Sequence, residues 1–193
     1  DRSPSRGLGD VYKRQDNGNI TKTTNPDGTF TLANYNSKNN LTAAIDAMGY
    51  ATIKAYDKDG VRLIKEAQSL NPLSQSDINT VTAKDFNPVT YLAENESSYA
   101  ITSHEYYADS YVSGVIGLIQ KTTDPEGNIT EYDYYKSGNG KGLVSEKWVY
   151  GNGISKPEHG TRYEYNAQLH VSKETSSEGY VKEYEYDKFN NVT

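Results

Sequence analysis

Two pairs of acidic residues have a spacing that could do chemistry. Glu131 and Asp133 lie two positions apart, and so do Glu183 and Glu185. On a β-strand, residues two apart project from the same face and lie about 7 Å from each other. Inverting glycosidases use two carboxyl groups about 6.5–9.5 Å apart, so the spacing is compatible with a glycan-cleaving enzyme. Both pairs alternate with tyrosines that recur along the chain, which favours a solvated acidic face opposite packed rings.

The residues that other catalytic or metal sites need are missing or wrongly spaced. The sequence has no cysteine, and its three histidines, His104, His159 and His170, form no i, i+4 metal-binding pair. There is no Gly-Xaa-Ser-Xaa-Gly nucleophile elbow, and residues 138–142 lack the spacing of a phosphate-binding loop. The sequence therefore predicts no catalytic, cofactor-binding or metal-binding residue, and we expect a protein that is not an enzyme.

Tyrosine dominates the aromatic residues that the fold must position. The chain has 18 Tyr among 193 residues, against 3 Phe and 1 Trp, and its hydrophobic fraction is only 34%. Tyr132 and Tyr134 alternate with acidic residues, and so do Tyr163 and Tyr165. This period of two predicts β-strands that carry rings on one face and carboxylates on the other.

The tyrosines belong to a repeat of 21 residues. Gly28 and Tyr35 recur 21 positions later as Gly49 and Tyr56, and Pro-Asp-Gly or Asp-Xaa-Xaa-Gly stretches supply turn chemistry. A unit of this length holds two strands of about six residues and two turns, which is a β-hairpin. Because a lone hairpin is only marginally stable, the hairpins must stack side by side, and we predict an all-β fold of repeated antiparallel β-hairpins. The residues that define the repeat are Gly28, Tyr35, Gly49, Tyr56, Asp57, Gly60, Gly127, Tyr132, Tyr134, Gly160, Tyr163, Tyr165, Gly179, Tyr184, Tyr186 and Asp187.

The repeat divides the chain into regions. It is regular over residues 16–64 and returns over residues 106–193, where it carries loop insertions, one of them between Tyr106 and Gly117. Residues 65–105 are a decayed repeat or an insertion. Within them, residues 77–86 fit a short helix or a strand, whereas residues 89–92 and 99–107 predict strands.

This repeat resembles that of the RHS/YD-repeat family. The family unit carries a Tyr-Asp pair, a glycine, an apolar-Thr step and an Asp-Pro-Xaa-Gly turn. These features stand here as Tyr56-Asp57-Lys58-Asp59-Gly60, as Tyr186-Asp187 through Val192-Thr193, and as Asp124-Pro125-Glu126-Gly127-Asn128-Ile129-Thr130. The resemblance covers roughly residues 16–64 and 106–193.

The resemblance implies a fragment of a large bacterial secreted or cell-surface protein, related to the animal teneurins. In that family the repeats form one long β-sheet that spirals into a hollow shell, and in toxin members the shell encloses a C-terminal toxic domain. Some members also carry a self-cleaving segment, which we do not find in this sequence. We therefore expect a non-enzymatic, cofactor-free segment of an open β-shell. Its main partner would be the rest of its own polypeptide, namely further repeats and a C-terminal effector.

A carbohydrate or cell-wall-binding repeat module is the alternative. Such modules share the repeat length and the Gly, Asn and Tyr content, but they are rich in Trp, and only Trp148 is present here. The formal net charge of -6 argues against nucleic-acid binding. The sequence contains no run of about 18 apolar residues that would span a membrane.

Residues 1–15 differ from the repeats. Residues 10–15, DVYKRQ, correspond to the translation of a transposase mosaic end used in sequencing-library preparation. We therefore expect residues 1–15 to be adapter-derived and disordered, and the remainder to be a piece of a longer protein whose true N-terminus is missing.

Four Asn-Xaa-Thr sequons occupy one register of the repeat. They begin at Asn19, Asn40, Asn128 and Asn191. This motif accepts N-linked glycans, but a turn-forming Asn followed by a strand accounts for it without a sugar.

Overall fold

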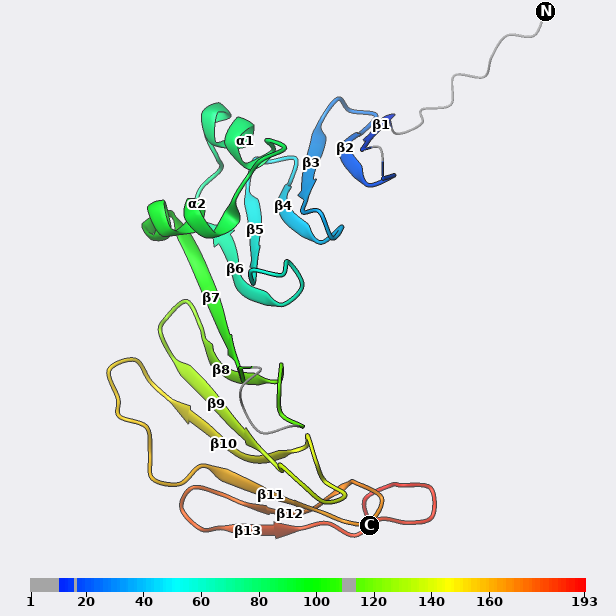
Figure 1. Cartoon of the computed structure of the whole chain (residues 1–193), viewed down its shortest axis with the longest axis vertical. Coiled ribbons are helices and arrows are strands. Elements are labelled where there is room, and N and C mark those ends of the chain that lie inside the picture. The colour runs from blue at the N-terminus through cyan, green and yellow to red at the C-terminus, as the bar shows by residue number, and fades with distance from the viewer. Residues whose placement is uncertain (1–10, 16, 109–113) are drawn as a thin grey trace, which may run out of the picture. The chain divides into compact units, whose positions relative to one another are not determined.

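The computed structural model describes residues 11–15, 17–108 and 114–193. Across these residues, thirteen strands form one sheet whose strand order is the sequence order, from β1 to β13 (Figure 1). The strands are β1 (Val11–Arg14), β2 (Ile20–Thr24), β3 (Phe30–Tyr35), β4 (Leu41–Ile45), β5 (Ala51–Tyr56), β6 (Leu63–Ser69), β7 (Tyr99–Tyr106), β8 (Ile119–Thr123), β9 (Ile129–Tyr134), β10 (Val144–Tyr150), β11 (Thr161–Tyr165), β12 (Val171–Thr175) and β13 (Val181–Glu183). The pairings are antiparallel, so the prediction of an all-β fold built from antiparallel hairpins is confirmed.

Most hairpins end in the same short turn. In the turn between β4 and β5, the Gly49 N–H donates to the Asp46 carbonyl (3.1 Å), and the Asp46 N–H donates to the Tyr50 carbonyl (2.9 Å). Gly49 has a φ of 89°, a conformation that L side chains rarely adopt. Where the repeat has no glycine, Asn39 and Leu169 take the left-handed conformation instead, with φ of 65° and 67°.

The chain divides into two compact units, the first unit Asp1–Thr102 and the second unit Ser103–Thr193, and β7 contributes residues to both. In the first unit, the helices α1 (Gln75–Val81) and α2 (Pro88–Glu94) and the 3-10 turn η1 (Glu96–Ser98) separate β6 from β7. None of the helices in the described part of the chain has the length and apolarity needed to cross a bilayer.

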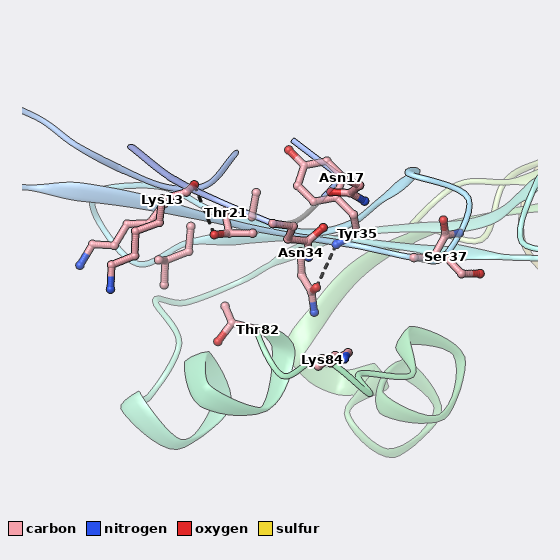
Figure 2. Close-up of a pocket in the computed structure, with 13 residues that line it drawn as sticks. Lys13, Asn17, Thr21, Asn34, Tyr35, Ser37, Thr82 and Lys84 are labelled. Atoms are coloured by element: carbon pink, nitrogen blue, oxygen red, sulfur yellow. Dashed lines mark hydrogen bonds between the residues drawn. The ribbon is translucent and has the colours of Figure 1, made fainter. Parts of the chain in front are cut away.

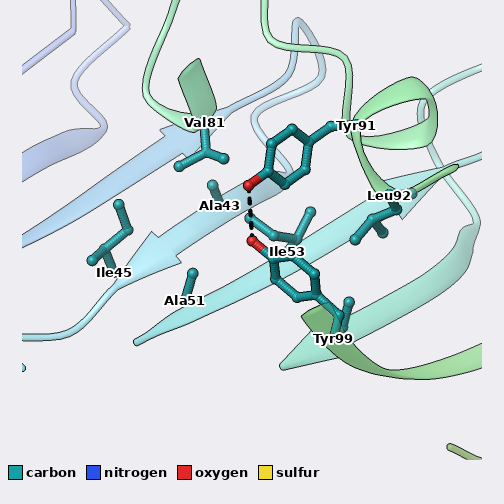
Figure 3. Close-up of a cluster of buried hydrophobic side chains, with 10 residues drawn as sticks. Ala43, Ile45, Ala51, Ile53, Val81, Tyr91, Leu92 and Tyr99 are labelled. Atoms are coloured by element: carbon teal, nitrogen blue, oxygen red, sulfur yellow. Dashed lines mark hydrogen bonds between the residues drawn. The ribbon is translucent and has the colours of Figure 1, made fainter. Parts of the chain in front are cut away.

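The helical insert covers one face of the sheet and makes the core of the first unit. Ile53 pairs with Ala43 and Ala67 across β4, β5 and β6, and all three are at most 1% exposed. Small alanine side chains let the helices approach closely, so that Leu92 of α2 packs into the same buried cluster (Figure 3).

One sequence-based expectation for this insert needs correction, and a second is confirmed. Residues 89–92 were expected to form a strand but lie in α2, because the Asn87 side chain caps the helix by accepting the N–H groups of Val89 (3.0 Å) and Thr90 (3.3 Å). Pro88 at the first turn also favours a helix start. The strand predicted over residues 99–107 is confirmed as β7.

The predicted disorder of residues 1–15 is not met at Val11–Arg14. These residues form β1, which pairs with the edge of β2, and unpaired backbone groups at a sheet edge accept an adjacent segment with little dependence on its sequence. Residues 1–10, and residues 109–113 of the insertion between Tyr106 and Gly117, lie outside the described residues.

The second unit lacks a comparable core. Among its described residues, Tyr107 and Val115 are the buried hydrophobic side chains, and most strand residues are half-buried. Its hairpins must therefore be stabilised largely by contacts within and between strands.

Candidate functional site

Four of the repeat tyrosines close the open ends of their own hairpins. In each case the Tyr hydroxyl, at the end of the second strand or shortly after it, donates to the backbone carbonyl of the first residue of the first strand. These hydrogen bonds run from Tyr56 to Leu41 (3.0 Å), Tyr134 to Ile119 (2.7 Å), Tyr165 to Val144 (2.9 Å) and Tyr186 to Val171 (2.7 Å). Burial raises the pKa of Tyr56, Tyr134 and Tyr165, so these hydroxyls remain protonated donors at neutral pH.

The acidic residue after the tyrosine closes the next turn. Asp57 Oδ1 accepts the backbone N–H groups of Val61 (2.9 Å) and Arg62 (3.2 Å), and Asp187 Oδ1 accepts that of Asn191 (3.0 Å). The hydrogen bond from Val61 lowers the pKa of Asp57, and hydrogen bonds from the side chain and backbone of Asn191 lower that of Asp187. The Tyr-Asp pair therefore has two separate structural tasks.

Two of the repeats carry a second tyrosine at the position that the acidic residue occupies in the others. Tyr107 donates its hydroxyl to the Tyr132 carbonyl (2.9 Å), and Tyr135 donates to the Tyr163 carbonyl (2.8 Å). Each bond reaches a strand of the following hairpin, and each of these tyrosines precedes a longer loop instead of a short turn. The second tyrosine thus links successive hairpins where a turn-closing carboxylate is absent.

The predicted glycines occupy two kinds of position. Gly28, Gly49, Gly60, Gly127 and Gly179 all have positive φ and lie in turns. Gly160 differs, because it lies beside β10, where a side-chain Cβ would fall 2.4 Å from the Lys147 carbonyl oxygen. Close backbone approach, and not turn geometry, explains this glycine.

The two faces of the sheet in the second unit differ in their side chains. Tyr132 and Tyr134 stack with ring centroids 6.3 Å apart on one face of β9. On the other face, a charged row runs in register across β7, β8 and β9, formed by Glu105, Lys121 and Glu131, and Trp148 of β10 lies next to its end. Further along the sheet, Tyr163 lies in β11, and Tyr184 follows β13 and donates its hydroxyl to the Glu174 carboxylate (3.3 Å).

The charged row ends in a tight cluster that sequence reasoning missed. The Lys156 Nζ lies 2.6 Å from Glu131 Oε2 and 3.7 Å from the centroid of the Trp148 ring, and the Tyr150 hydroxyl donates to Glu131 Oε1. Burial acts to raise the pKa of Glu131, but the hydrogen bonds from Lys156 and Tyr150 outweigh it and lower that pKa. Burial and the bond to Glu131 raise the pKa of Tyr150 to about 12.

In the first of the two acidic pairs singled out from the sequence, both carboxylates have partners. Glu131 is held in the cluster, whereas Asp133 Oδ1 accepts the Tyr134 N–H (2.9 Å) and lies 3.6 Å from the Lys136 Nζ. Glu183 faces Lys173 across β12 and β13.

The histidines are dispersed over the second unit. His104 Nδ1 lies 3.0 Å from the Thr122 hydroxyl, and His159 lies 3.9 Å from Glu158. His170 packs on the Tyr186 ring, with ring centroids 5.0 Å apart. In the part of the chain that the structure describes, no three His, Asp or Glu side chains are grouped so that they could hold a metal ion.

A polar groove of about 880 Å³ lies in the first unit between β1–β3 and the segment that follows α1 (Figure 2). Asn34, which is 5% exposed, spans its floor by donating to the carbonyls of Val81 (3.0 Å) and Ala83 (2.8 Å). Lys13 and Lys84 lie at its rim, and the groove opens widely to solvent.

The four sequon asparagines hold turns. Their side-chain amides donate hydrogen bonds from Asn19 to Asn39 Oδ1 (3.3 Å), from Asn40 to the Gly60 carbonyl (2.8 Å), from Asn128 to Asp124 Oδ2 (2.9 Å) and from Asn191 to Asp187 Oδ2 (3.0 Å). The nitrogen that would carry a glycan thus donates a hydrogen bond at each sequon, within the same turn at Asn128 and Asn191 and to another turn at Asn19 and Asn40.

No protein-family model matches the chain, and no curated protein matches it. Among solved structures, it is similar to a chain of the Photorhabdus luminescens Tc holotoxin pore, with a TM-score of 0.46 and 12% identity over 91% of this chain and 10% of that chain. It is also similar to a chain of the TcdB2-TccC3 structure, with a TM-score of 0.39 and 14% identity over 95% of this chain and 11% of that chain. The chain thus spans about a tenth of the length of these relatives. With TM-scores below 0.5, these likenesses establish neither a family nor an activity for it.

Proposed function

We propose that this chain is a non-enzymatic structural segment of a YD-repeat shell, which encloses cargo or a C-terminal effector domain of a secreted or surface protein. The observation that carries the proposal is the strand order, because thirteen described strands pair strictly in sequence order. Such a sheet can be extended by further hairpins at its edge, because an edge strand presents unpaired backbone N–H and C=O groups.

The hydrogen bonds of the repeat support a structural role. The Tyr134 and Tyr186 hydroxyls each close their own hairpin, and Tyr107 and Tyr135 tie successive hairpins together. These side chains therefore stabilise the hairpins, which supports a structural role.

The test uses the longer polypeptide expressed from the complete reading frame. If the repeats form a shell, the region after residue 193 resists protease while the repeats are intact. It should become sensitive when Tyr134→Ala and Tyr165→Ala open two hairpins. Equal digestion of that region in both proteins would overturn the proposal.

A carbohydrate or cell-wall-binding module is the second candidate. The observation in its favour is the exposure of two rings beside β13, Tyr180 at 76% and Phe189 at 71%, because exposed aromatic faces can stack on sugars. A peptidoglycan pull-down and a glycan array separate the two candidates. Binding that disappears in Tyr180→Ala or Phe189→Ala would favour this module over the shell.

A further inference from the structure

The loop between β10 and β11, residues 151–160, is anchored to the sheet at few points. At its end, the Gly160 N–H donates to Glu146 Oε1 (2.7 Å), and this glycine packs against β10. Residues 152–159 are all exposed, and Ile154 is 61% exposed, so the loop buries no apolar side chain. Its start is held by the Asn152 side-chain amide, which donates to the Glu126 carbonyl (3.5 Å), and its middle by Lys156.

The surface beneath Lys156 has the chemistry of an ammonium-binding site. Trp148 lies opposite Glu131 in the pairing of β9 with β10, so an indole face and a carboxylate stand side by side. The Tyr150 hydroxyl holds Glu131 Oε1, which leaves Oε2 free to accept a cation. An indole face and a carboxylate both attract an alkylammonium group, and an aromatic face selects for it over an anion or a neutral group.

The other charges around Glu131 suit a single added cation. Lys121 lies opposite Glu131 in the pairing of β8 with β9 and is paired with Glu105 (3.1 Å). Glu131 therefore faces Lys121 from β8, Tyr150 and Trp148 from β10, and Lys156 from the loop. Without Lys156, Glu131 would lose its direct ion pair while the rest of its surroundings stayed in place.

We propose that Trp148, Glu131 and Tyr150 form a binding site for a primary alkylammonium group, which Lys156 of the same chain fills, so that the 151–160 loop is a displaceable cover of that site. The ligand is a free alkylamine or the lysine side chain of another polypeptide segment, since both present the same group. This inference goes beyond the proposed shell function and does not depend on it.

The test exploits Trp148, the one tryptophan of the chain, as a fluorescent reporter at the site itself. Lys156→Ala in the full chain should change Trp148 emission. Titration with n-butylammonium chloride should restore the wild-type emission, with half-saturation on the order of 10 mM, as expected for two weak contacts. Potassium chloride at equal ionic strength should not restore the wild-type emission. Nα-acetyl-lysine methylamide is the second probe, and a lower half-saturating concentration than that of butylammonium would identify a polypeptide lysine as the ligand.

The matched control is Lys173→Ala. Lys173 pairs with Glu164 (3.4 Å) and has similar exposure to Lys156, 36% against 39% for the side chains, but no ring contact is found for it among the described residues. Its loss should leave Trp148 emission and the response to amine unchanged. Wild-type emission in Lys156→Ala, or an amine effect no larger than that of potassium chloride, would overturn the proposal.

A competition experiment covers the case in which Lys156→Ala does not fold. In the wild-type chain, butylammonium must displace Lys156, which competes from the same chain at a high effective concentration. Amine in excess should therefore speed cleavage after Glu158 in the loop by a glutamate-specific protease, beyond the rate in equal potassium chloride. No acceleration at any amine concentration that leaves the far-UV circular dichroism intact would also overturn the proposal.

Discussion

The two units contain the same hairpin but stabilise it differently. In the first unit, helices cover a sheet face of alanine and isoleucine, and both Ile53 and Leu92 are fully buried. In the second unit, the described residues include no helix, and the hairpins rely on Tyr134-type hydroxyl bonds, stacked rings and cross-strand ion pairs. The comparison teaches that the repeat specifies a strand and turn geometry, whereas the covering segment decides whether an apolar core forms.

The side chains beneath the helical insert explain why the insert packs on this face of the sheet. Tyr91 of α2 and Tyr99 of β7 meet under the insert with their hydroxyls 3.0 Å apart, so both polar atoms are satisfied inside the core (Figure 3). Burial and this contact raise the pKa of Tyr99 far above its ordinary value. Burial also raises the pKa of Tyr91, so both hydroxyls favour the neutral form.

The largest expected effect lies in the covered face. Leu92→Ala removes a fully buried side chain and should lower the free energy of unfolding by about 2–5 kcal/mol, measured by urea denaturation. Val89→Ala in the same helix is the control, because Val89 is 43% exposed and its loss should cost less than about 0.5 kcal/mol. Equal losses for the two variants would show that α2 does not cover a core.

A smaller loss is expected where the insert is hydrogen-bonded to the sheet. Asn34→Ala leaves the Val81 and Ala83 carbonyls without their donor, which should cost about 1–3 kcal/mol in the same denaturation experiment. Asn34→Leu has a similar volume but restores no donor, and it should be as destabilising. A neutral effect of both variants would mean that the insert is held by apolar contacts alone.

In the second unit, the loss of one hairpin-closing hydroxyl should be smaller still. Tyr134→Phe keeps the ring but removes the donor to the Ile119 carbonyl, at a cost of about 1 kcal/mol, measured through the urea midpoint of Trp148 fluorescence. Tyr180→Phe is the matched control, since this side chain is 76% exposed, and it should leave the midpoint unchanged. If Tyr134→Phe has no effect, ring packing and not the hydroxyl closes the hairpin.

The smallest effect on stability should come from protonating a carboxylate that closes a turn. The pKa of Asp187 lies below its ordinary value of about 3.9, so its stabilising contribution is complete above that pH and is lost as the pH falls through the lowered value. Asp187→Asn should keep the turn, as Asn166 does with its own amide oxygen, but remove this acid dependence. Urea midpoints between about pH 4 and pH 2 provide the measurement, and an unchanged slope in the variant would exclude a role for this carboxylate.

The repeat made the strands and turns predictable, but it did not predict the helical insert that covers the sheet of the first unit. The alternation around Tyr132 and the Asp-Xaa-Xaa-Gly stretches fix hairpins because they depend only on local geometry. The helix α2 was missed since its Val-Thr-Tyr-Leu stretch also suits a strand, although Asn87-Pro88 is a recognisable helix start.

The Lys156 cluster could not be derived from the sequence. Lys156 lies in a loop without periodicity, and its partner Glu131 is 25 residues away. The contact depends on the register that sets Glu131 opposite Trp148 and on the close approach of Gly160 to β10. Neither is encoded in any short motif, because both arise from the path of a loop that departs from the repeat.

The self-contained hairpin has a consequence for how the repeat region can evolve. The Tyr56–Leu41 bond and the turn closed by Asp57 both fall within one hairpin and the turn that follows it. Unequal recombination between similar repeats can therefore lengthen or shorten the sheet by a whole hairpin while every remaining contact of this kind survives. The helical insert has no such freedom, since Asn34 in β3 bonds to residues that lie beyond β6 in the chain. Selection can thus vary the extent of the uncovered sheet readily, whereas the covered part must be inherited as a block.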